Sequence, residues 1–99
     1  MIAIKNLKAG KPKNPWDVKV DRSSSLGNPF YMGSESQRDE VCDKYVTWFE
    51  SNKSPAFHLE LKRLRELYVE HGQLNLFCWC APKRCHAETI RQYLLGNLA

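Results

Sequence analysis

The sequence lacks several features of membrane and secreted proteins. No run of apolar side chains approaches the roughly 18 residues of a membrane-spanning helix, and the chain does not open with the charged, apolar and small-residue segments of a signal peptide. Disulfide scaffolds spread their cysteines along the chain, whereas three of the four cysteines here lie within residues 78–86. We therefore expect a cytoplasmic protein with no membrane partner, whose cysteines are thiols, metal ligands or reactive groups.

The length and charge of the chain limit its organisation. With 99 residues, no internal repeat and no low-complexity segment, it is expected to form a single α/β domain over residues 1–99. The net charge of +4 is moderate, and six of the 15 Lys and Arg residues fall in the first 22 positions, with Lys83 and Arg84 near the other end. If these charges meet in the fold, they form a local anion site without making the protein a nucleic-acid binder.

The spacing of apolar residues predicts alternating strands and helices. The sequence from Ser34 has the capping-box spacing of a helix start, and Gly72 is typical of a helix end. In chain order, the predicted elements are strands over 2–7 and 16–22, helices over 34–51 and 55–71, a strand over 74–77 and a helix over 87–95. Residues 8–15 and 23–31 are expected to be loops because they are rich in Gly, Pro, Ser and Asn.

This order of elements predicts the fold class. Two helices separate the last strand from the strand before it, which is typical of a right-handed crossover between parallel strands. We expect an α/β fold with a small, mostly parallel three-stranded sheet and about three packed helices, in a Rossmann-like arrangement. The strands that hold Val18 and Phe77 should run parallel, so that their carboxyl ends direct loop 22–30 and turn 80–86 toward one place.

The cysteine cluster falls on a predicted strand-to-helix turn. N–H groups at the start of a helix are unpaired and favour anions, and a cysteine there has a lowered pKa. Cys85 occupies this position. We therefore expect Cys85 to be alkylated faster than Cys42, which is interpreted as a small hydrophobe of the core, with Cys78 protected by the sheet and Cys80 intermediate.

The expected site combines this turn with the loop after the second strand. Cys85 is the candidate nucleophile or polarised thiol, and His86 is the candidate base or hydrogen-bond donor. Asp21 is expected to reach the same place together with Arg22. The candidate ligand-binding residues are Arg22, Ser24, Asn28, Cys80, Lys83 and Arg84. No metal ligand is assigned, and the sequence identifies no cofactor.

With these motifs assembled, the chain resembles a family of short, uncharacterised proteins that is common in bacteriophages, also occurs in bacteria, and is classed only as a domain of unknown function. The likeness covers the strand and Arg-Ser loop at 18–24, the Gly-Asn-Pro-Phe sequence at 27–30, and the Cys-Trp-Cys-x-Pro-x-x-Cys-His motif at 78–86. Similar proteins often carry a glycine where this chain has Asp21. The resemblance implies the architecture and the choice of site, and it supplies no reaction.

The residues leave three interpretations of the cysteines open. Cys78, Cys80, Cys85 and His86 provide the four ligands of a tetrahedral zinc site, although their Cys-x-Cys and adjacent Cys-His spacing is unusual for structural zinc. Alternatively, the thiols belong to a small-molecule site at the turn. In the third interpretation they are core residues and helix caps with no chemical role.

Two functions of different classes fit these features. The first is a phage-type protein that binds a nucleotide or other phosphorylated small molecule between loop 22–30 and turn 80–86, with or without a reaction on it. The turn lacks the closing arginine of phosphatase loops, so phosphatase chemistry is not predicted. The second is a small interaction protein that binds and inhibits a bacterial host protein, with structural or zinc-binding cysteines. If a phage encodes the protein, its expected compartment is the host cytoplasm.

Overall fold

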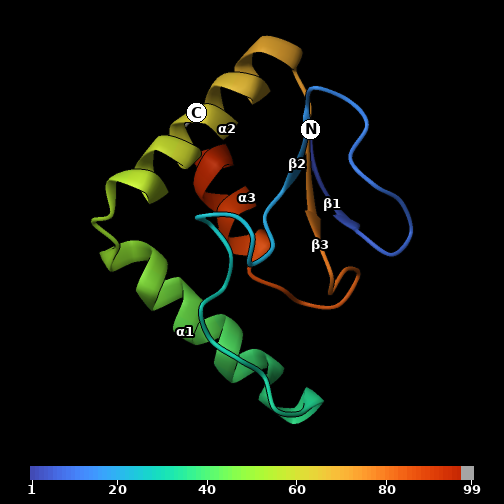
Figure 1. Ribbon diagram of the computed structural model, residues 1–99. Helices are drawn as coiled ribbons and strands as arrows, with labels where there is room; N and C mark the ends of the chain where they lie inside the picture. The colour runs from blue at the N-terminus through green and yellow to red at the C-terminus, as the bar shows by residue number, and fades with distance from the viewer. Residues whose placement is uncertain (97–99) are drawn as a thin grey trace.

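Strand β3 (Leu74–Cys78) is the centre of the fold, with a parallel strand on each side in the computed structural model, which describes residues 1–96 (Figure 1). The other elements are β1 (Ile2–Asn6), β2 (Asp17–Lys19), the short 3-10 helix η1 (Glu35–Gln37), α1 (Arg38–Ser51), α2 (Pro55–His71) and α3 (Ala87–Gly96). The sheet order is β1-β3-β2, and both pairings are parallel. The predicted α/β fold with a three-stranded parallel sheet and three helices is confirmed.

The two crossovers between strands lie on opposite faces of the sheet. The chain passes from β1 over to β2 and then returns to the central β3. Because right-handed crossovers in opposite directions use opposite faces, the helices and the β1–β2 connection are expected on different sides. Figure 1 shows this arrangement: the helices lie on one side of the sheet, and the connection over residues 7–16 lies on the other.

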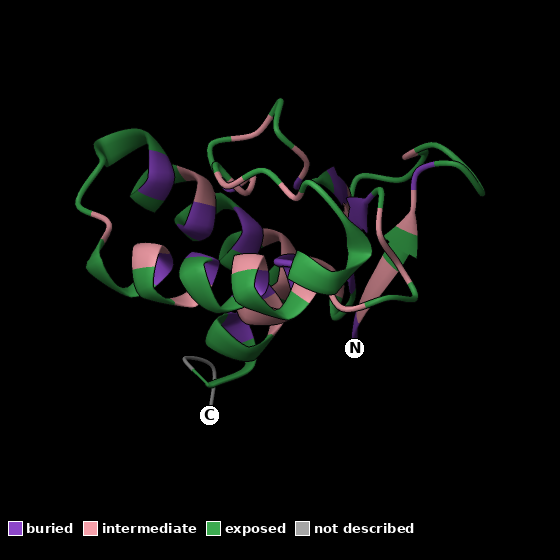
Figure 2. Ribbon diagram, turned by 90° about the horizontal axis from the view of Figure 1, so that it is seen from below, coloured by how far each residue is buried: buried purple, intermediate pink, exposed green. Residues whose placement is uncertain are grey.

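The hydrophobic core fills the space between the sheet and the helices. Alternate residues of a strand point to opposite faces, and Leu74, Leu76 and Cys78 of β3 are at most 1% exposed on the helical side. They belong to one buried cluster with Leu64 of α2 and Ile90 of α3. Figure 2 shows the same division, with buried residues along the inner sides of the helices and exposed residues outside. Burying one such aliphatic side chain contributes roughly 1.5–3 kcal/mol.

Some element boundaries differ from the predicted ones. Strand β2 covers only three residues, where the sequence predicted 16–22. The N–H of Val20 still donates to the carbonyl of Phe77 (2.9 Å), but the chain then turns at Asp21. The predicted capping box is also wrong in part, because the Ser34 side chain makes no cap and Gln37 instead accepts from the N–H of Gly33 (2.7 Å).

Helix α2 has the predicted boundaries. Pro55 occupies its first turn, and Gly72 ends it in the left-handed conformation (φ 69°), which glycine adopts at low cost. Within the part of the chain that the structure describes, no helix is both long enough and apolar enough to span a membrane.

The loop after β2 depends on a glycine, and this generates a testable prediction. A Cβ atom placed on Gly27 would lie 2.6 Å from the Cα of Arg22, because the loop folds back on its own backbone. We expect Gly27→Ala to lower the free energy of unfolding by about 1–3 kcal/mol, as overpacking does. Urea denaturation measures the change. Gly10→Ala is the matched control, since no atom lies within 4 Å of its Cβ position; equal stabilities for the two variants would contradict the proposed crowding.

Candidate functional site

The carboxyl ends of β2 and β3 meet at one edge of the sheet, as the parallel pairing requires. Two side chains connect the loops that follow these strands. Nε2 of His86 donates to the carbonyl of Val20, and Nε1 of Trp79 donates to Oδ2 of Asp21 (3.2 Å). The predicted convergence of the two loops is therefore confirmed.

A cavity of about 450 Å³ opens between these loops and the start of α1. Its apolar wall includes Phe30, Tyr31, Val41 and Trp79. Its charged groups are the carboxylate of Asp21 and three guanidinium groups. This combination of a mainly apolar, concave surface with a few polar groups is typical of small-molecule sites.

The cavity gathers six of the eight predicted site residues, which are Arg22, Asn28, Cys80, Arg84, Cys85 and His86. The other two face elsewhere. The hydroxyl of Ser24 accepts from the N–H of Leu26 (3.1 Å), and Ser24 borders a separate hollow beside β2. Lys83 is exposed and forms an ion pair with Glu35 (3.2 Å). Ser24 and Lys83 are thus placed outside the cavity that holds the rest.

Arg22 organises the loop after β2 and lies at the mouth of the cavity. Its Nε donates to the carbonyl of Asn28 and its Nη2 to the carbonyl of Phe30, each at 3.1 Å. The guanidinium carbon also lies 3.8 Å from the centre of the Tyr31 ring, a cation–π contact. These contacts hold the guanidinium in place and leave three of its five N–H donors for other partners.

The predicted positive potential of the 80–86 turn is largely offset by carboxylates. Arg84 pairs with Asp39 (3.0 Å) and Asp43 (2.8 Å), which are neighbours on one face of α1. Lys83 and Arg38 both bind Glu35, and their hydrogen bonds lower the pKa of that carboxyl to about 2. Arg22, by contrast, has no carboxylate partner within residues 1–96 among the ion pairs of the structure.

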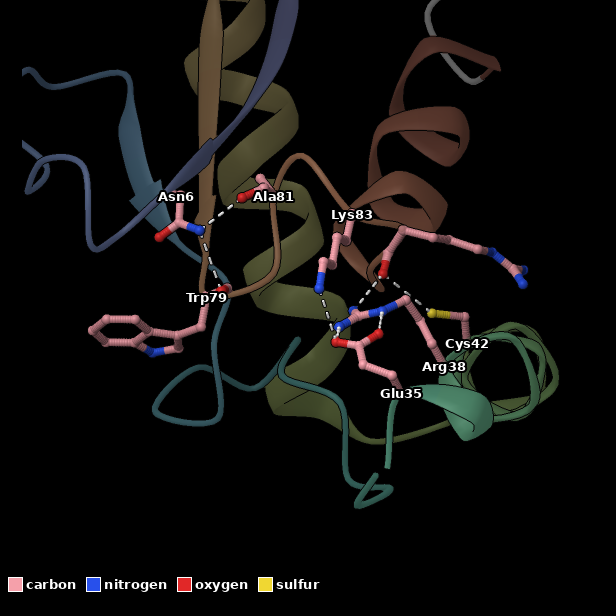
Figure 3. Close-up of polar contacts among 8 residues, drawn as sticks. Asn6, Glu35, Arg38, Cys42, Trp79, Ala81 and Lys83 are labelled. Atoms are coloured by element: carbon pink, nitrogen blue, oxygen red, sulfur yellow. Dashed lines mark hydrogen bonds and ion pairs between the residues drawn. The ribbon is translucent and has the colours of Figure 1, made fainter. Parts of the chain in front are cut away.

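Arg38 is a site residue that the sequence did not identify. It is the first residue of α1, and its Nη1 donates to the carbonyl of Arg84 (2.9 Å), the same carbonyl that the Cys42 thiol approaches at 3.8 Å (Figure 3). Its guanidinium is also hydrogen-bonded to the thiol of Cys80. The start of α1 therefore forms a wall of the cavity, which no spacing in the sequence indicates.

The first strand contributes to the turn as well. Asn6, the last residue of β1, donates from Nδ2 to the carbonyl of Ala81 (2.7 Å) and to the carbonyl of Trp79 (3.3 Å) (Figure 3). The turn contains a cis peptide bond between Ala81 and Pro82 and is closed by the N–H of Lys83, which donates to the carbonyl of Cys80 (2.9 Å). All three strands thus position the residues that follow β3.

The environment of Cys85 differs from the predicted one. Its side chain is 3% exposed, and its sulfur lies 3.1 Å from the sulfur of Cys78, which is 1% exposed. The hydrogen bond with Cys78, followed by burial, raises the pKa of Cys85, where the sequence predicted a lowered value. The same hydrogen bond lowers the pKa of Cys78 to about 6, with help from the N–H groups of Cys80 and Ala81.

The helix start near Cys85 is already occupied by the protein's own groups. The N–H of Ala87 is bonded to the Cys85 sulfur. The N–H of Cys85 donates to the carboxylate of Glu88 (3.4 Å), an acceptor from the first turn of α3 itself. The anion that the sequence predicted at this helix start is therefore matched in the structure by a carboxylate of the chain.

His86 is buried and neutral in the fold. Burial is the main cause that lowers its pKa, and its ring lies edge-on against Tyr45, with the ring centres 5.1 Å apart. Because Nε2 donates to a carbonyl, the neutral ring carries its proton on Nε2. The hydroxyl of Tyr45 donates to the carbonyl of Leu26 (2.6 Å). Tyr45 and His86 together attach the loop after β2 to the helical layer.

The four ligands of the zinc interpretation do not converge in the structure. Within residues 1–96, no group of three or more His, Cys, Asp or Glu side chains is arranged to hold a metal ion. Cys78 and Cys85 approach each other, but His86 directs Nε2 to a backbone carbonyl and Cys80 contacts Arg38.

The fold and the site define a small α/β domain with a ligand-sized cavity at the carboxyl edge of a parallel sheet. The chain belongs to the family described as Domain of unknown function (DUF4326), which matches residues 4–96. Comparison with curated proteins and with solved structures finds no match. The expected membership of a domain family of unknown function is confirmed, and this match names no ligand, activity or source.

The burial of the thiols predicts their order of alkylation. Cys80 is half-buried in the cavity wall beside Arg38, whereas Cys42, Cys78 and Cys85 are at most 5% exposed. We expect brief iodoacetamide treatment of the reduced, native protein to label Cys80 at least about tenfold faster than the other three, because alkylation requires an accessible thiolate. Mass spectrometry of tryptic peptides gives the ranking, and labelling in urea gives the unprotected reference. Fastest labelling at Cys85 would instead support the order expected from the sequence.

The burial of His86 predicts a dependence of stability on pH. The unfolded chain binds a proton at His86 below pH 6.5, whereas the folded chain with its lowered pKa does not. The unfolded state therefore binds more protons in this range, and stability falls as the pH is lowered, by at most about 1.4 kcal/mol per pH unit. Urea denaturation between about pH 5.5 and pH 7.5 measures the slope.

His86→Gln, which keeps an amide donor for the Val20 carbonyl, should lose this contribution to the slope. His58→Gln is the control, because His58 lies on α2 and its ring bonds only the carbonyl of Asn52 among the polar contacts of the described residues. Equal slopes for His86→Gln and the unmodified protein would show that His86 is not the titrating group.

Proposed function

We propose that this protein is of phage type and binds a nucleotide or other phosphorylated small molecule in the cavity between loop 22–30 and turn 80–86. The observation that carries the proposal is the state of Arg22. Its guanidinium is fixed at the cavity mouth by two backbone carbonyls and the Tyr31 ring, and within residues 1–96 no carboxylate neutralises it. Such a group suits a phosphate, which accepts hydrogen bonds from the guanidinium fork.

The other arginines of the cavity support binding less directly. Arg38 and Arg84 line it, but each has carboxylate partners that offset its charge and fix its side chain. The carboxylate of Asp21 is engaged by the N–H and hydroxyl of Ser23 (3.1 and 2.5 Å) and by Trp79, so its charge is partly compensated as well. Arg22 is therefore the group from which we expect most of the affinity for an anion.

Aromatic side chains beside Arg22 favour a ligand with a flat ring. Tyr31 and Trp79 both line the cavity and are 76% and 55% exposed. Large exposed aromatic rings beside a cation resemble the stacking surfaces on which proteins hold bases, each worth roughly 1–3 kcal/mol. The cavity volume of about 450 Å³ lies in the range of small-molecule sites. These features together support a nucleotide over inorganic phosphate.

A reaction on the bound molecule is a further part of the proposal. Cys85 and His86 remain its candidate catalytic residues, and both reach the cavity wall. Their burial restricts them to a ligand that enters the cavity fully. Incubation with each binding nucleotide, followed by chromatography of the products, tests this part, and an unchanged nucleotide would indicate a binding protein.

The test of binding uses thermal unfolding with a panel of nucleoside mono-, di- and triphosphates and their unphosphorylated nucleosides. We expect at least one nucleotide to raise the midpoint and to bind the unmodified protein roughly 10–100-fold more tightly than Arg22→Gln, the effect of one charged hydrogen bond. Arg65→Gln is the matched control, because it removes the same charge from an exposed position on α2. Absence of stabilisation by every phosphorylated ligand would refute the proposal.

The second candidate is binding to a bacterial host protein, and the exposure of Tyr31 and Trp79 favours it. Aromatic residues are enriched in the central parts of protein interfaces. The two candidates differ in the role of Arg22. A stoichiometric host partner that still binds Arg22→Gln, but not a variant with both aromatic residues changed to alanine, would support an interaction protein.

A further inference from the structure

Two thiols lie side by side in the core, and one of them, Cys85, also reaches the cavity wall. The sulfurs of Cys78, at the end of β3, and Cys85, just before α3, are 3.1 Å apart. A disulfide requires about 2.05 Å, so the two sulfurs need to approach by roughly 1 Å. The other two cysteines have different neighbours: Cys42 faces the carbonyl of Arg84, and Cys80 contacts Arg38.

We propose that Cys78 and Cys85 form a redox-active dithiol that reduces a small hydroperoxide and closes into an intramolecular disulfide. This activity is separate from nucleotide binding and does not depend on it. The inference rests on the proximity of two reduced thiols, on the hydrogen bonds around them and on the access that the cavity gives to one of them.

The hydrogen bonds around the pair favour one thiolate and one thiol. The Cys85 thiol and the N–H groups of Cys80 and Ala81 surround the Cys78 sulfur, and they hold the pKa of Cys78 near 6. Cys85 retains its proton because a second negative charge beside the first is unfavourable. At neutral pH the pair thus holds a nucleophile and a proton donor in contact.

The cavity determines which oxidants reach the pair. Cys85 lines its wall, whereas both sulfurs are otherwise enclosed by the core. A small hydroperoxide that enters the cavity can contact Cys85. A bulky disulfide such as oxidised glutathione requires an exposed sulfur for in-line attack, and neither cysteine is more than 3% exposed.

The proposed reaction balances with hydrogen peroxide as the oxidant. Cys85, which lines the cavity, passes its proton to the Cys78 thiolate across the 3.1 Å contact and attacks one peroxide oxygen, so that an S–O bond forms, the O–O bond breaks and hydroxide leaves with the electron pair. The Cys78 thiol protonates this hydroxide to water and becomes a thiolate again. The Cys78 thiolate then attacks the sulfur of the Cys85 sulfenic acid, so that the S–S bond forms, the S–O bond breaks and a second hydroxide leaves. This hydroxide takes up the proton that the pair lost when Cys78 first ionised. A small thiol such as dithiothreitol returns the disulfide to the reduced state.

Trypsin separates the relevant cysteines into different peptides. Cleavage after Arg38 and Lys44 leaves Cys42 in peptide 39–44, and cleavage after Arg65, Lys83 and Arg84 leaves Cys78 and Cys80 in 66–83 and Cys85 in 85–91. We expect treatment of the reduced protein with hydrogen peroxide, followed by blocking of free thiols, to yield peptides 66–83 and 85–91 joined, with a mass lower by two hydrogen atoms. Dithiothreitol should separate them.

Single variants of the other cysteines decide which sulfur of peptide 66–83 is joined. The link should persist in Cys80→Ser and in Cys42→Ser, so no variant of the buried pair is needed. Loss of the link in Cys80→Ser would overturn the assignment to Cys78. Oxygen addition to single cysteines without any link, or four thiols that stay free after peroxide, would overturn the redox-active dithiol.

Discussion

The parallel pairing of β3 with a strand on each side is the constraint on which the rest of the structure depends. It brings the ends of three strands to one edge of the sheet, although they are far apart in the sequence. Each end supplies one connection to the same place: Asn6 from β1 bonds the 79–81 turn, Val20 after β2 accepts from His86, and β3 leads directly into the turn. The loop after β2, the turn after β3 and the start of α1 line the cavity, while Asn6 holds the turn in place from behind.

The apolar side chains that stabilise the fold and the polar groups that build the cavity lie next to each other along the chain. Residues 74–78 alternate between the core and the outer face, and the residue after them, Trp79, is 55% exposed at the cavity mouth. Within the same short stretch the chain passes from close-packed interior to ligand-accessible surface. Cys78 and Cys85 lie on this boundary, and Cys85, although buried, also lines the cavity.

The local signals in the sequence predicted the elements well and the long-range contacts only in part. Some signals act through neighbouring residues, so the elements that they form can be predicted from the sequence alone. Examples are the apolar run of β3, Pro55 at the start of α2 and Gly72 at its end. The partners of Arg84 cannot be predicted in this way, because Asp39 and Asp43 become its neighbours only when α1 packs on the turn. For the same reason the charge expected at the turn was overestimated, and the pKa of Cys85, which depends on Cys78, was predicted in the wrong direction.

The three arginines of the cavity differ in their partners. Two of them are paired with carboxylates of the fold, and the third binds only neutral groups. Arg38 and Arg84 bind carbonyls and carboxylates that join α1 to the turn, so a phosphate would have to compete with fixed intramolecular anions for them. Arg22 binds neutral carbonyls, which satisfy part of its hydrogen-bonding capacity and leave its charge uncompensated. Because a carbonyl dipole offsets far less charge than a carboxylate does, the same residue can hold its loop and still attract an anion. For the proposed phosphorylated ligand, we therefore expect the anion to bind at the loop after β2 rather than at the start of α3.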